Sequence, residues 1–485
     1  MRIFTLWLMV FAGLLLAGPA AAYRIGPEAD HNSPHQNQGQ TNGQVHYREE
    51  CNTAQSQIDQ GIDRYTTNLT GIYTKVNNVR SRLLTGGDVW WDREDGKYIV
   101  PHPDPGGKEV ASLFAGAVWL GGVDPAGNLK TACQTYGNRT GNSDFWPGPL
   151  DLIGNTEQTV CENWDRFFEV YAQEIDIHRN LYARSLAGES YSPDQIPEGV
   201  KGWPARGNPF FFEINEFELP NTDQGLAGFW DENGDDLYNP LDGDYPIIEI
   251  RGCTEPQYPD QMIFWIYNDN GSNVHGESMG TPIKMEVQVQ AFAYGTNDEL
   301  NDMTFQRYKL INRATEDIDS TYFAMWVDAD LGCFLDDYIG CDTSRSLAYT
   351  YNADAVDGDN GTDCSGGVTT YGNEIPIIGT DYFRGPLKIL IDTINGEEVR
   401  DTIELGMSSF TYYNNGGYNN PPAGTTDPQT AEEFYNYLTG HWRDGSPFQY
   451  GGDAYQEGAS DSLDYAFVSP PNDPGAWSMC TENLP

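Results

Sequence analysis

The chain of 485 residues carries a formal net charge of −45, because 72 acidic residues outnumber 27 basic ones. Such a surface repels nucleic acid, whose binding needs Lys and Arg in place of phosphate counterions, and it also repels anionic lipid. It attracts divalent cations, which would relieve the repulsion between carboxylates, although a gain in solubility alone is the simpler alternative. The length is sufficient for two or three domains with a sizeable core.

The first 22 residues have the pattern of a secretory signal peptide. Arg2 supplies the positive end, residues 3–16 form an apolar core, and Ala20-Ala21-Ala22 is a small-residue cleavage site. Maturation would leave Tyr23 as the first residue. No later stretch approaches the roughly 20 apolar residues of a membrane span. The sequence therefore predicts a secreted protein, extracellular or at the cell surface, with no transmembrane segment in the mature chain.

After the signal, composition divides the chain into three parts. Residues 23–50 are rich in Gln, Asn, Gly and His and are predicted to be a disordered polar leader. Residues 51–220 mix strand and helix patterns, and residues 221–485 form a β-rich region with acidic calcium loops. The predicted fold is mainly β with minor α, an antiparallel β-sandwich or meander with inserted helices and calcium-binding loops.

Within residues 51–220, a helix is predicted from Cys161 to Arg184. Its apolar residues recur at steps of three and four and would share one face: Trp164, Phe167, Phe168, Tyr171, Ile175, His178, Leu181 and Tyr182. On that face, His178 is expected to be a core histidine with satisfied hydrogen bonds rather than a metal ligand. Upstream, the apolar run at 113–123 predicts a buried strand or strand pair.

Residues 221–485 contain the clearest sheet. The second of its strands alternates apolar and polar residues, which predicts one buried and one wet face. Short links between the strands predict an antiparallel meander. A hairpin is expected at Asn395-Gly396, and a helix is expected from Pro428 to Leu438 with Asp427 as its N-cap. The four predicted meander strands are Gln261–Tyr267, Ile283–Tyr294, Met303–Asn312 and Thr321–Val327.

The most specific chemical signal is an acidic loop. A calcium ion takes six to eight oxygen ligands, which a twelve-residue loop supplies from positions 1, 3, 5, 7, 9 and 12. The pattern resembles a dockerin-type loop, which also ends in Asp, although Asp236 stands where the sharp turn usually has Gly. A solvated acidic turn is the alternative interpretation. The predicted ligands are Asp231, Asn233, Asp235, Leu237 through its backbone carbonyl, Asn239 and Asp242.

Two further acidic segments follow predicted strands, one after Val327 and one after residues 347–351. Alternating Asp residues at a strand end project carboxylates from one edge, which is a common way to gather oxygen ligands. A second calcium site is therefore predicted, with a solvated loop as the alternative. Its candidate ligands are Asp328, Asp330, Asp336, Asp354, Asp357 and Asp359.

Other chemistry is weakly indicated. Eight cysteines in an exported chain permit disulfides, and Cys333 with Cys341 is a plausible local pair. Residues 276–280 fit the G-x-S-x-G pattern of serine hydrolases, but a strand follows where the nucleophile elbow needs a helix, so no catalytic Ser278 is predicted. A glycosidase pair of carboxylates stays open, because a sequence does not reveal the separation of two carboxyl groups.

Several motifs in order resemble the N-terminal region of large secreted surface proteins of Bacteroidota, usually exported by the type IX secretion system. This resemblance covers about residues 78–485 and implies a surface protein of largely uncharacterised activity. Such proteins normally continue into repeat domains and a sorting domain, so a chain that ends at Pro485 is expected to be a fragment or a shortened member. The motifs include GGDVWWD (86–92), LFAGAVWLGG (113–122), DFWPGPLD (144–151), CENWDRFFEVY (161–171), FWDENGDDLYNPLDGDYP (229–246) and STYFAMWVDADLGCFLDDYIGCD (320–342).

The leading hypothesis is a secreted, calcium-stabilised extracellular surface module that acts in adhesion or assembly without enzymatic activity. Its expected partners are surface polysaccharides, other surface proteins or further copies of itself. One alternative is a module that binds or hydrolyses polysaccharide, because acidic loops and abundant Trp and Tyr could form a sugar cleft. Another alternative is a subunit of an extracellular filament or surface layer.

Overall fold

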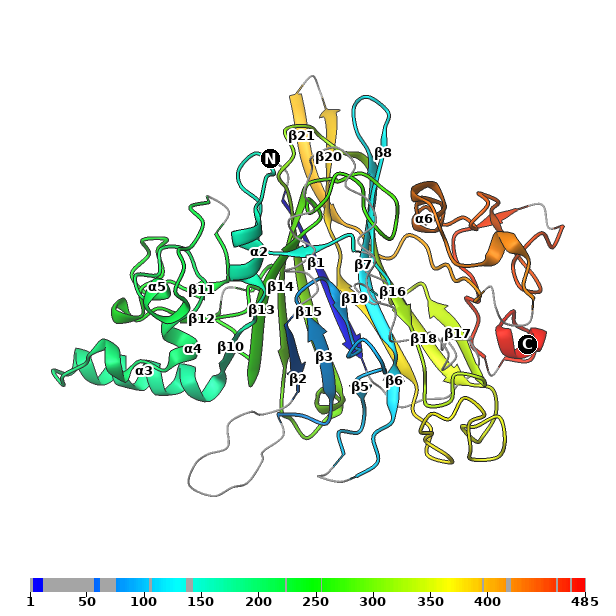
Figure 1. Ribbon diagram of the computed structural model, residues 1–485, viewed down its shortest axis with the longest axis horizontal. Helices are drawn as coiled ribbons and strands as arrows, with labels where there is room; N and C mark the ends of the chain where they lie inside the picture. Colours follow the sequence, from blue (N-terminus) through cyan, green and yellow to red (C-terminus); the bar gives the residue numbers. More distant parts are fainter. Residues whose placement is uncertain are drawn as a thin grey trace, which may run out of the picture.

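Two large antiparallel sheets form the centre of the protein (Figure 1). The structure is a computed structural model, and the predicted leader at 23–50 lies outside the residues that it describes. The mainly β fold with minor helices is confirmed. The described residues are 3–11, 56–61, 76–103, 107–136, 143–222, 225–253, 255–394, 397–415, 420–458, 461–471 and 473–484.

The first sheet, sheet A, has nine strands, one of which, β9 (Trp146–Pro147), pairs with β13 at the side of the main path. Its order along the sheet is β10 (Phe168–Tyr171), β13 (Gln261–Asn268), β14 (Met285–Ala293), β15 (Met303–Asn312), β1 (Ile3–Phe11), β19 (Ile378–Arg384), β18 (Leu347–Asn352) and β17 (Asp337–Asp342).

The second sheet, sheet B, has eight strands. Its order is β16 (Asp319–Asp328), β7 (Ala115–Val123), β4 (Asp88–Val89), β3 (Arg80–Leu84), β5 (Tyr98–Ile99) and β6 (Ala111–Leu113), with β2 (Gln57–Gln60) paired to β3 and β8 (Leu129–Cys133) paired to β7.

Shorter elements surround the sheets. Three strand pairs stand apart: β11 (Phe229–Trp230) with β12 (Tyr245–Pro246), β20 (Leu387–Ile394) with β21 (Glu397–Glu404), and β22 (Phe448–Gln449) with β23 (Ser462–Leu463). The α-helices are α2 (Gln158–Trp164), α3 (Ala172–Leu186), α4 (Glu198–Lys201), α5 (Phe211–Asn215), α6 (Ala431–Leu438) and α7 (Met479–Glu482). The 3-10 turns are η2 (Pro193–Gln195), η3 (Pro240–Asp242), η4 (Glu299–Asp302) and η5 (Ala423–Thr425).

The main core lies between the two sheets. Leu83 and Val118 of sheet B and Trp265 and Val289 of sheet A are all completely buried in it. A second core covers the other face of sheet A with helices α2 to α5 (Figure 1). A third core packs α6 on the outer face of sheet B and α7 beside strand β17 of sheet A. Among the residues that the structure describes, no helix combines the length and apolar character needed to cross a membrane.

The predicted meander is confirmed for its first three strands, β13, β14 and β15. The fourth, predicted at Thr321–Val327, is β16, and it lies in sheet B because it pairs with the apolar strand β7. Strands of the regions 51–220 and 221–485 therefore pair with each other in both sheets, since β10 also pairs with β13. These two regions do not form separate sheets.

The prediction of one wet face on β14 is wrong. All nine of its residues are buried, because the second core covers the face that the polar residues occupy. These polar side chains have partners in the interior. Glu286 pairs with Arg313 at 3.0 Å, and both side chains are 0% exposed, while Gln290 donates a hydrogen bond to the carbonyl oxygen of Ile247.

The helix predicted from Cys161 to Arg184 is interrupted. Helix α2 ends at Trp164, strand β10 covers Phe168–Tyr171, and α3 starts at Ala172. Strand β10 gains the edge of β13 as a hydrogen-bonding partner, which outweighs the helical periodicity. The prediction for His178 is confirmed: the ring is buried, and its nitrogens bond to the Asp244 carbonyl (2.9 Å) and the Tyr191 hydroxyl (2.8 Å).

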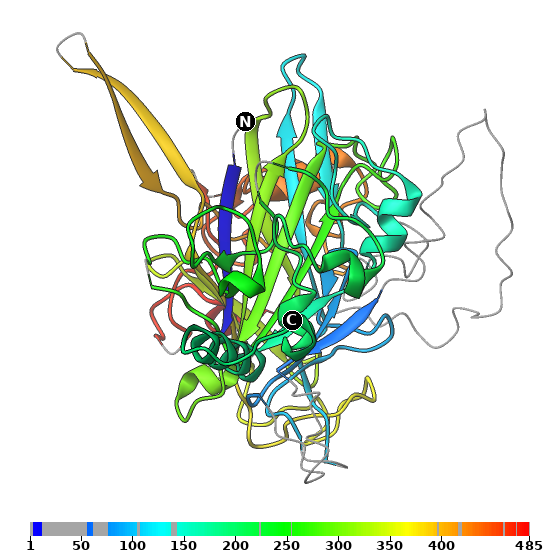
Figure 2. The same ribbon diagram turned by 90° about the vertical axis from the view of Figure 1, so that its left-hand side faces the viewer.

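Two smaller predictions concern the C-terminal half. Helix α6 starts at Ala431 rather than Pro428, because Thr430, not Asp427, caps it by accepting the Glu433 N–H. The expected hairpin is present as β20 and β21, with Ile394 opposite Glu397, and its turn residues 395 and 396 lie outside the described residues. The hairpin projects from the body of the molecule (Figure 2).

Candidate metal centre

Five oxygen-bearing side chains gather at one end of sheet A. Asp337 is the first residue of β17 and lies opposite Asn352, the last residue of β18. Both side chains are buried, with Asp337 at 0% and Asn352 at 4% exposure. The segment between β16 and β17 and the loop after β18 supply the other members. We call the group the Asp337 cluster: Asp330, Asp336, Asp337, Asn352 and Asp357.

Backbone N–H groups fix two of these carboxylates from one side. Asp337 Oδ2 accepts a hydrogen bond from the Leu331 N–H at 2.8 Å. Asp357 accepts from the N–H of Cys333 at 2.7 Å and from that of Tyr371. Position 332 must be glycine, because its backbone has a φ of +75° and an added Cβ would lie 2.0 Å from Asp357 Oδ2.

Other oxygens of the Asp337 cluster have no hydrogen-bond donor in the part of the chain that the structure describes. The Oδ1 atoms of Asp336, Asp337 and Asn352 are buried and have no hydrogen-bond partner among the described residues. Asn352 directs its amide nitrogen at Asp336 Oδ2 (2.8 Å), which turns its oxygen toward the inside of the cluster. Buried polar atoms are normally satisfied, so this group of unpaired oxygens marks a place where a cation or an ordered water could bind.

The electrostatics agree with this geometry. Burial raises the pKa of Asp337 well above its ordinary value, and the charges of Asp330, Asp336 and Asp357 raise it further. Burial also raises the pKa of Asp357 to about 6, with Asp336 adding to the rise and Lys108 opposing it. Buried carboxylates that repel one another must either take up protons or bind a cation.

Two members of the cluster are close enough to share a divalent cation, although among the described residues no third carboxylate of the cluster lies within the same 4.8 Å limit. Carboxylate oxygens of Asp336 and Asp357 lie within 4.8 Å of each other. Two oxygens on one calcium ion, each at about 2.4 Å, are at most about 4.8 Å apart. The donors are carboxylate and amide oxygens, which calcium prefers over softer ligands. The Cys333 sulfur also lies within this distance, but it is bonded to Cys364.

The structure brings together three of the six ligands predicted for this site, Asp330, Asp336 and Asp357. Of the other three, Asp328 is held elsewhere, whereas Asp354 and Asp359 lie at the exposed edge of the cluster, where their charges still raise the pKa of Asp336. Asp328 accepts a hydrogen bond from the Tyr136 hydroxyl at 2.7 Å at the end of β16. Asp354 and Asp359 are exposed and accept backbone N–H bonds from Val356 and Ser365 within their own loop.

Asp337 and Asn352 were absent from the predicted ligand set. The signal that could have selected them is their position at the facing ends of β17 and β18, which only the pairing register reveals. The disulfide next to the cluster also differs from the prediction: Cys333 bonds to Cys364 with a Cα–Cα distance of 5.5 Å, and Cys341 is free and buried in β17. The observed disulfide joins the two loops that carry the Asp337 cluster.

The predicted loop at Asp231–Asp242 is compact and mostly exposed. Asp231 accepts hydrogen bonds from the N–H groups of Gly234 (2.7 Å), Asp235 (3.3 Å) and Asp236 (2.8 Å). Asp235 accepts from the Leu237 N–H at 2.9 Å. The backbone of Asp236 has a φ of 62°, so this aspartate adopts the left-handed conformation that glycine usually supplies.

The end of this loop differs from the predicted pattern. Asn239 donates to Asp242 Oδ2 at 2.6 Å, whereas the buried Asp244 accepts the N–H groups of Glu232 and Asn239 and so closes the loop. Burial raises the pKa of Asp244 to about 6, and the charges of Asp231 and Asp235 add to the rise. Among the described residues, no group of three carboxylates from this loop lies within 4.8 Å of one another.

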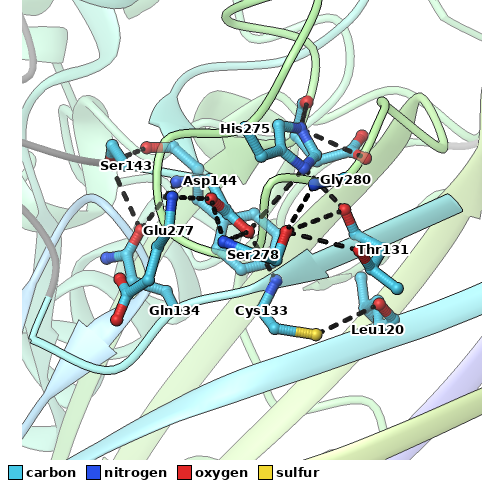
Figure 3. A network of polar contacts seen from close by, with 12 residues as sticks. Leu120, Thr131, Cys133, Gln134, Ser143, Asp144, His275, Glu277, Ser278 and Gly280 are labelled. Carbon is cyan, nitrogen blue, oxygen red and sulfur yellow. Dashed lines mark hydrogen bonds and ion pairs between the residues drawn. The ribbon is translucent and has the colours of Figure 1, made fainter. Parts of the chain in front are cut away.

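The G-x-S-x-G segment belongs to a buried polar network (Figure 3). The ring nitrogens of His275 face two backbone carbonyl oxygens, those of Thr131 and Asp269, each at 2.6 Å. Both ring nitrogens are therefore engaged with the backbone, and among the described residues no hydrogen bond joins the ring to Ser278, which is 0% exposed.

Asp144 is the centre of this network. It accepts hydrogen bonds from the N–H groups of Cys133 (2.8 Å), Glu277 (2.9 Å) and Ser278 (3.2 Å), and thereby joins β8 to the connection between β13 and β14. The arrangement lacks a nucleophile paired with a base and an opening for a substrate, so we interpret it as structural.

Comparisons with known proteins found no matching family model, no matching curated protein and no matching solved structure.

Proposed function

We propose that the chain is a secreted, calcium-stabilised surface module that acts in adhesion or assembly and is not an enzyme. The Asp337 cluster carries this proposal, because its unpaired buried oxygens form a place where a cation could bind. Calcium is the expected ion, since it accepts six to eight oxygen ligands in irregular geometry and is available outside cells at the concentrations that extracellular sites require.

The position of the cluster suggests what the ion would do. It joins the ends of β17 and β18 to the segment that leaves β16, and therefore links sheet A to sheet B. The loop at 231–242 also lies between a peripheral helix and the rest of the fold. Asp244, which follows the loop, accepts a hydrogen bond from His178 of α3 through its carbonyl oxygen. Calcium at both places would hold peripheral segments on the sheets rather than operate a switch.

A calcium titration with matched variants tests the proposal. Melting of the wild-type chain is compared in chelator and in 10 mM calcium, beside Asp336→Asn/Asp357→Asn for the cluster and Asp231→Ala/Asp235→Ala for the loop. Asp401→Asn, exposed on strand β21 and part of neither site, serves as the control. Calcium should raise the melting temperature of the wild type and the control, and each double variant should lose part of that rise. An identical melt with and without calcium in all four proteins would refute the proposal.

A second candidate, a module that binds polysaccharide, rests on a cavity of about 1380 Å³ beside β16. Its lining includes Trp119 and Trp326, whose rings are stacked with a centroid distance of 6.4 Å, and Tyr413, which stacks on Trp119. Aromatic faces suit sugar rings, and the carboxylates of Asp328 and Asp427 also line this space. Titration of oligosaccharides with Trp326→Ala as a control would identify this function, and sugar release that depends on Asp328 would show hydrolysis.

A further inference from the structure

Strand β1 occupies an unusual place for its sequence. Residues Ile3–Phe11 form the core of the predicted signal peptide, yet the structure places them inside sheet A between β15 and β19 (Figure 1, Figure 2). The strand pairs antiparallel with β15 over its whole length, from Ile3 opposite Ile311 to Phe11 opposite Met303. On its other side it pairs with β19 over a shorter stretch.

Removal of this segment would leave a gap in the sheet. Strands β15 and β19 are neighbours only through β1. Because adjacent strands lie about 4.8 Å apart, the gap is about 10 Å wide, which is too far for β15 and β19 to bond directly. Both strands would then present unpaired N–H and C=O groups along facing edges, and such edges bind extended segments readily.

We propose that, once residues 1–22 are removed, the gap between β15 and β19 accepts an extended segment of a second protein, which completes sheet A by strand addition. This inference rests on the export in the function proposed above. In this proposal the protein accepts a strand from its partner, and the gap between β15 and β19 is the surface through which it assembles.

The walls of the gap define the chemistry of the segment. On β15, Tyr308 and Leu310 face the core between the sheets, and Met303 and Phe305 face the core on the other side. The cavity beside β16 continues along the same place, since Leu310 lines it together with side chains of β19. The segment should therefore be about nine residues long, free of proline and apolar on the face that points between the sheets, while the opposite face of β15 also carries Arg307 and Lys309.

Other parts of this chain are poor occupants. Every strand in the described residues is already paired with another strand. Residues 23–50 follow the cleavage site directly, but they contain Pro27 and Pro34, many charged or amide side chains and few apolar residues. The hairpin β20–β21 exposes apolar residues such as Ile389 and Ile391, but its strands bond to each other.

Secretion of the full chain followed by hydrogen exchange tests the proposal. Mass spectrometry of the secreted product first determines whether residues 1–22 are removed. Exchange is then measured at 303–312 and 378–384, alone and with a synthetic peptide of residues 3–11 flanked by lysines. The matched control peptide carries Leu6→Pro and Leu8→Pro, which remove backbone donors and prevent strand pairing.

In the processed chain, both segments should exchange rapidly, and the peptide should slow them at least tenfold while the proline peptide does not. Self-association that protects the same segments and reverses on dilution would overturn the exclusion of this chain's own segments as occupants, and with it the proposal of a different partner protein. Protection in the processed monomer, or no effect of the peptide, overturns it. A secreted chain that keeps residues 1–22 overturns both the gap and the predicted signal cleavage, whereas the calcium-dependent melt is independent of either result.

Discussion

The substitution Asp337→Asn tests the electrostatics of the Asp337 cluster most directly. The amide can keep the hydrogen bond from the Leu331 N–H, while its nitrogen replaces the oxygen that has no donor. The change therefore removes one buried charge, preserves the shape and supplies a donor to the neighbouring carboxylates. We expect the variant to be more stable than the wild type in chelator and less responsive to calcium.

The spacing within the cluster sets the magnitude. Two ionised carboxylates 4.8 Å apart, the limit for Asp336 and Asp357, repel each other by about 3.5 kcal/mol at an effective dielectric constant of 20. At a pH where Asp337 is ionised in the metal-free protein, loss of its repulsion by Asp330, Asp336 and Asp357 should stabilise that protein by about 1–3 kcal/mol. Unfolding entropy for a chain of this length is about 1 kcal/mol per degree, so the melting temperature should rise by about 1–3 °C in chelator.

Calcium should stabilise the wild type more than the Asp337→Asn variant. At ten to a hundred times its dissociation constant, an ion stabilises the wild type by about 1.4–2.7 kcal/mol, which corresponds to about 1–3 °C. The variant should lose most of this rise. Scanning fluorimetry in chelator and in 10 mM calcium measures both quantities, with Asp401→Asn, exposed on strand β21, as the control. A variant that is less stable than the wild type in chelator and still gains the full calcium effect would falsify the reasoning.

Three further predictions concern other parts of the fold. Burial, followed by the charge of Asp144, raises the pKa of Glu277 to about 8. Because the folded pKa exceeds the unfolded value near 4.5, the contribution of Glu277 to stability is fully present below pH 4.5 and is lost as the pH rises through 8, by at most about 5 kcal/mol. The substitution Glu277→Gln should therefore flatten the dependence of the melting temperature on pH between pH 5 and 9. An unchanged dependence contradicts the assignment. Replacement of Arg313 by Met leaves Glu286 buried without its cation and should destabilise the fold by about 3–5 kcal/mol in denaturant titrations, whereas a neutral effect would show that water replaces the pair. Finally, Cys364→Ser opens a disulfide with a sequence separation of 31 and should reduce the free energy of unfolding by up to about 3.5 kcal/mol. The affinity for calcium should fall as well. Equal melting temperatures of the variant and the wild type would show that the disulfide does not constrain the loops of the Asp337 cluster.

The local patterns of the sequence were reliable where one element decides its own structure. Segments of strand length predicted β13, β14 and β15, with alternation in β14, and the hairpin at 395–396 followed from its turn residues. The left-handed backbone of Asp236 was expected from the loop pattern. These features depend on neighbours within a few residues, so a sequence pattern is sufficient to predict them.

The errors arose where a distant segment competes. The helical periodicity of 161–184 is real, but the free edge of β13 converts Phe168–Tyr171 into a strand. The polar face of β14 looked solvated, yet helices α2 to α5 and the segments around them cover it. A sequence gives the polarity of a face but not the layer that packs on it.

The sequence by itself determined that this protein is acidic and β-rich, and it predicts calcium binding by carboxylates in three segments. Only the tertiary structure decided which carboxylates meet, because Asp330, Asp337 and Asp357 converge through the pairing of β17 with β18 and the disulfide beside them. It also decided that residues 3–11 fit the gap between β15 and β19. The physical reason is the same in both cases: ligand sites and strand edges depend on distances between segments far apart in the chain, and these distances exist only after folding.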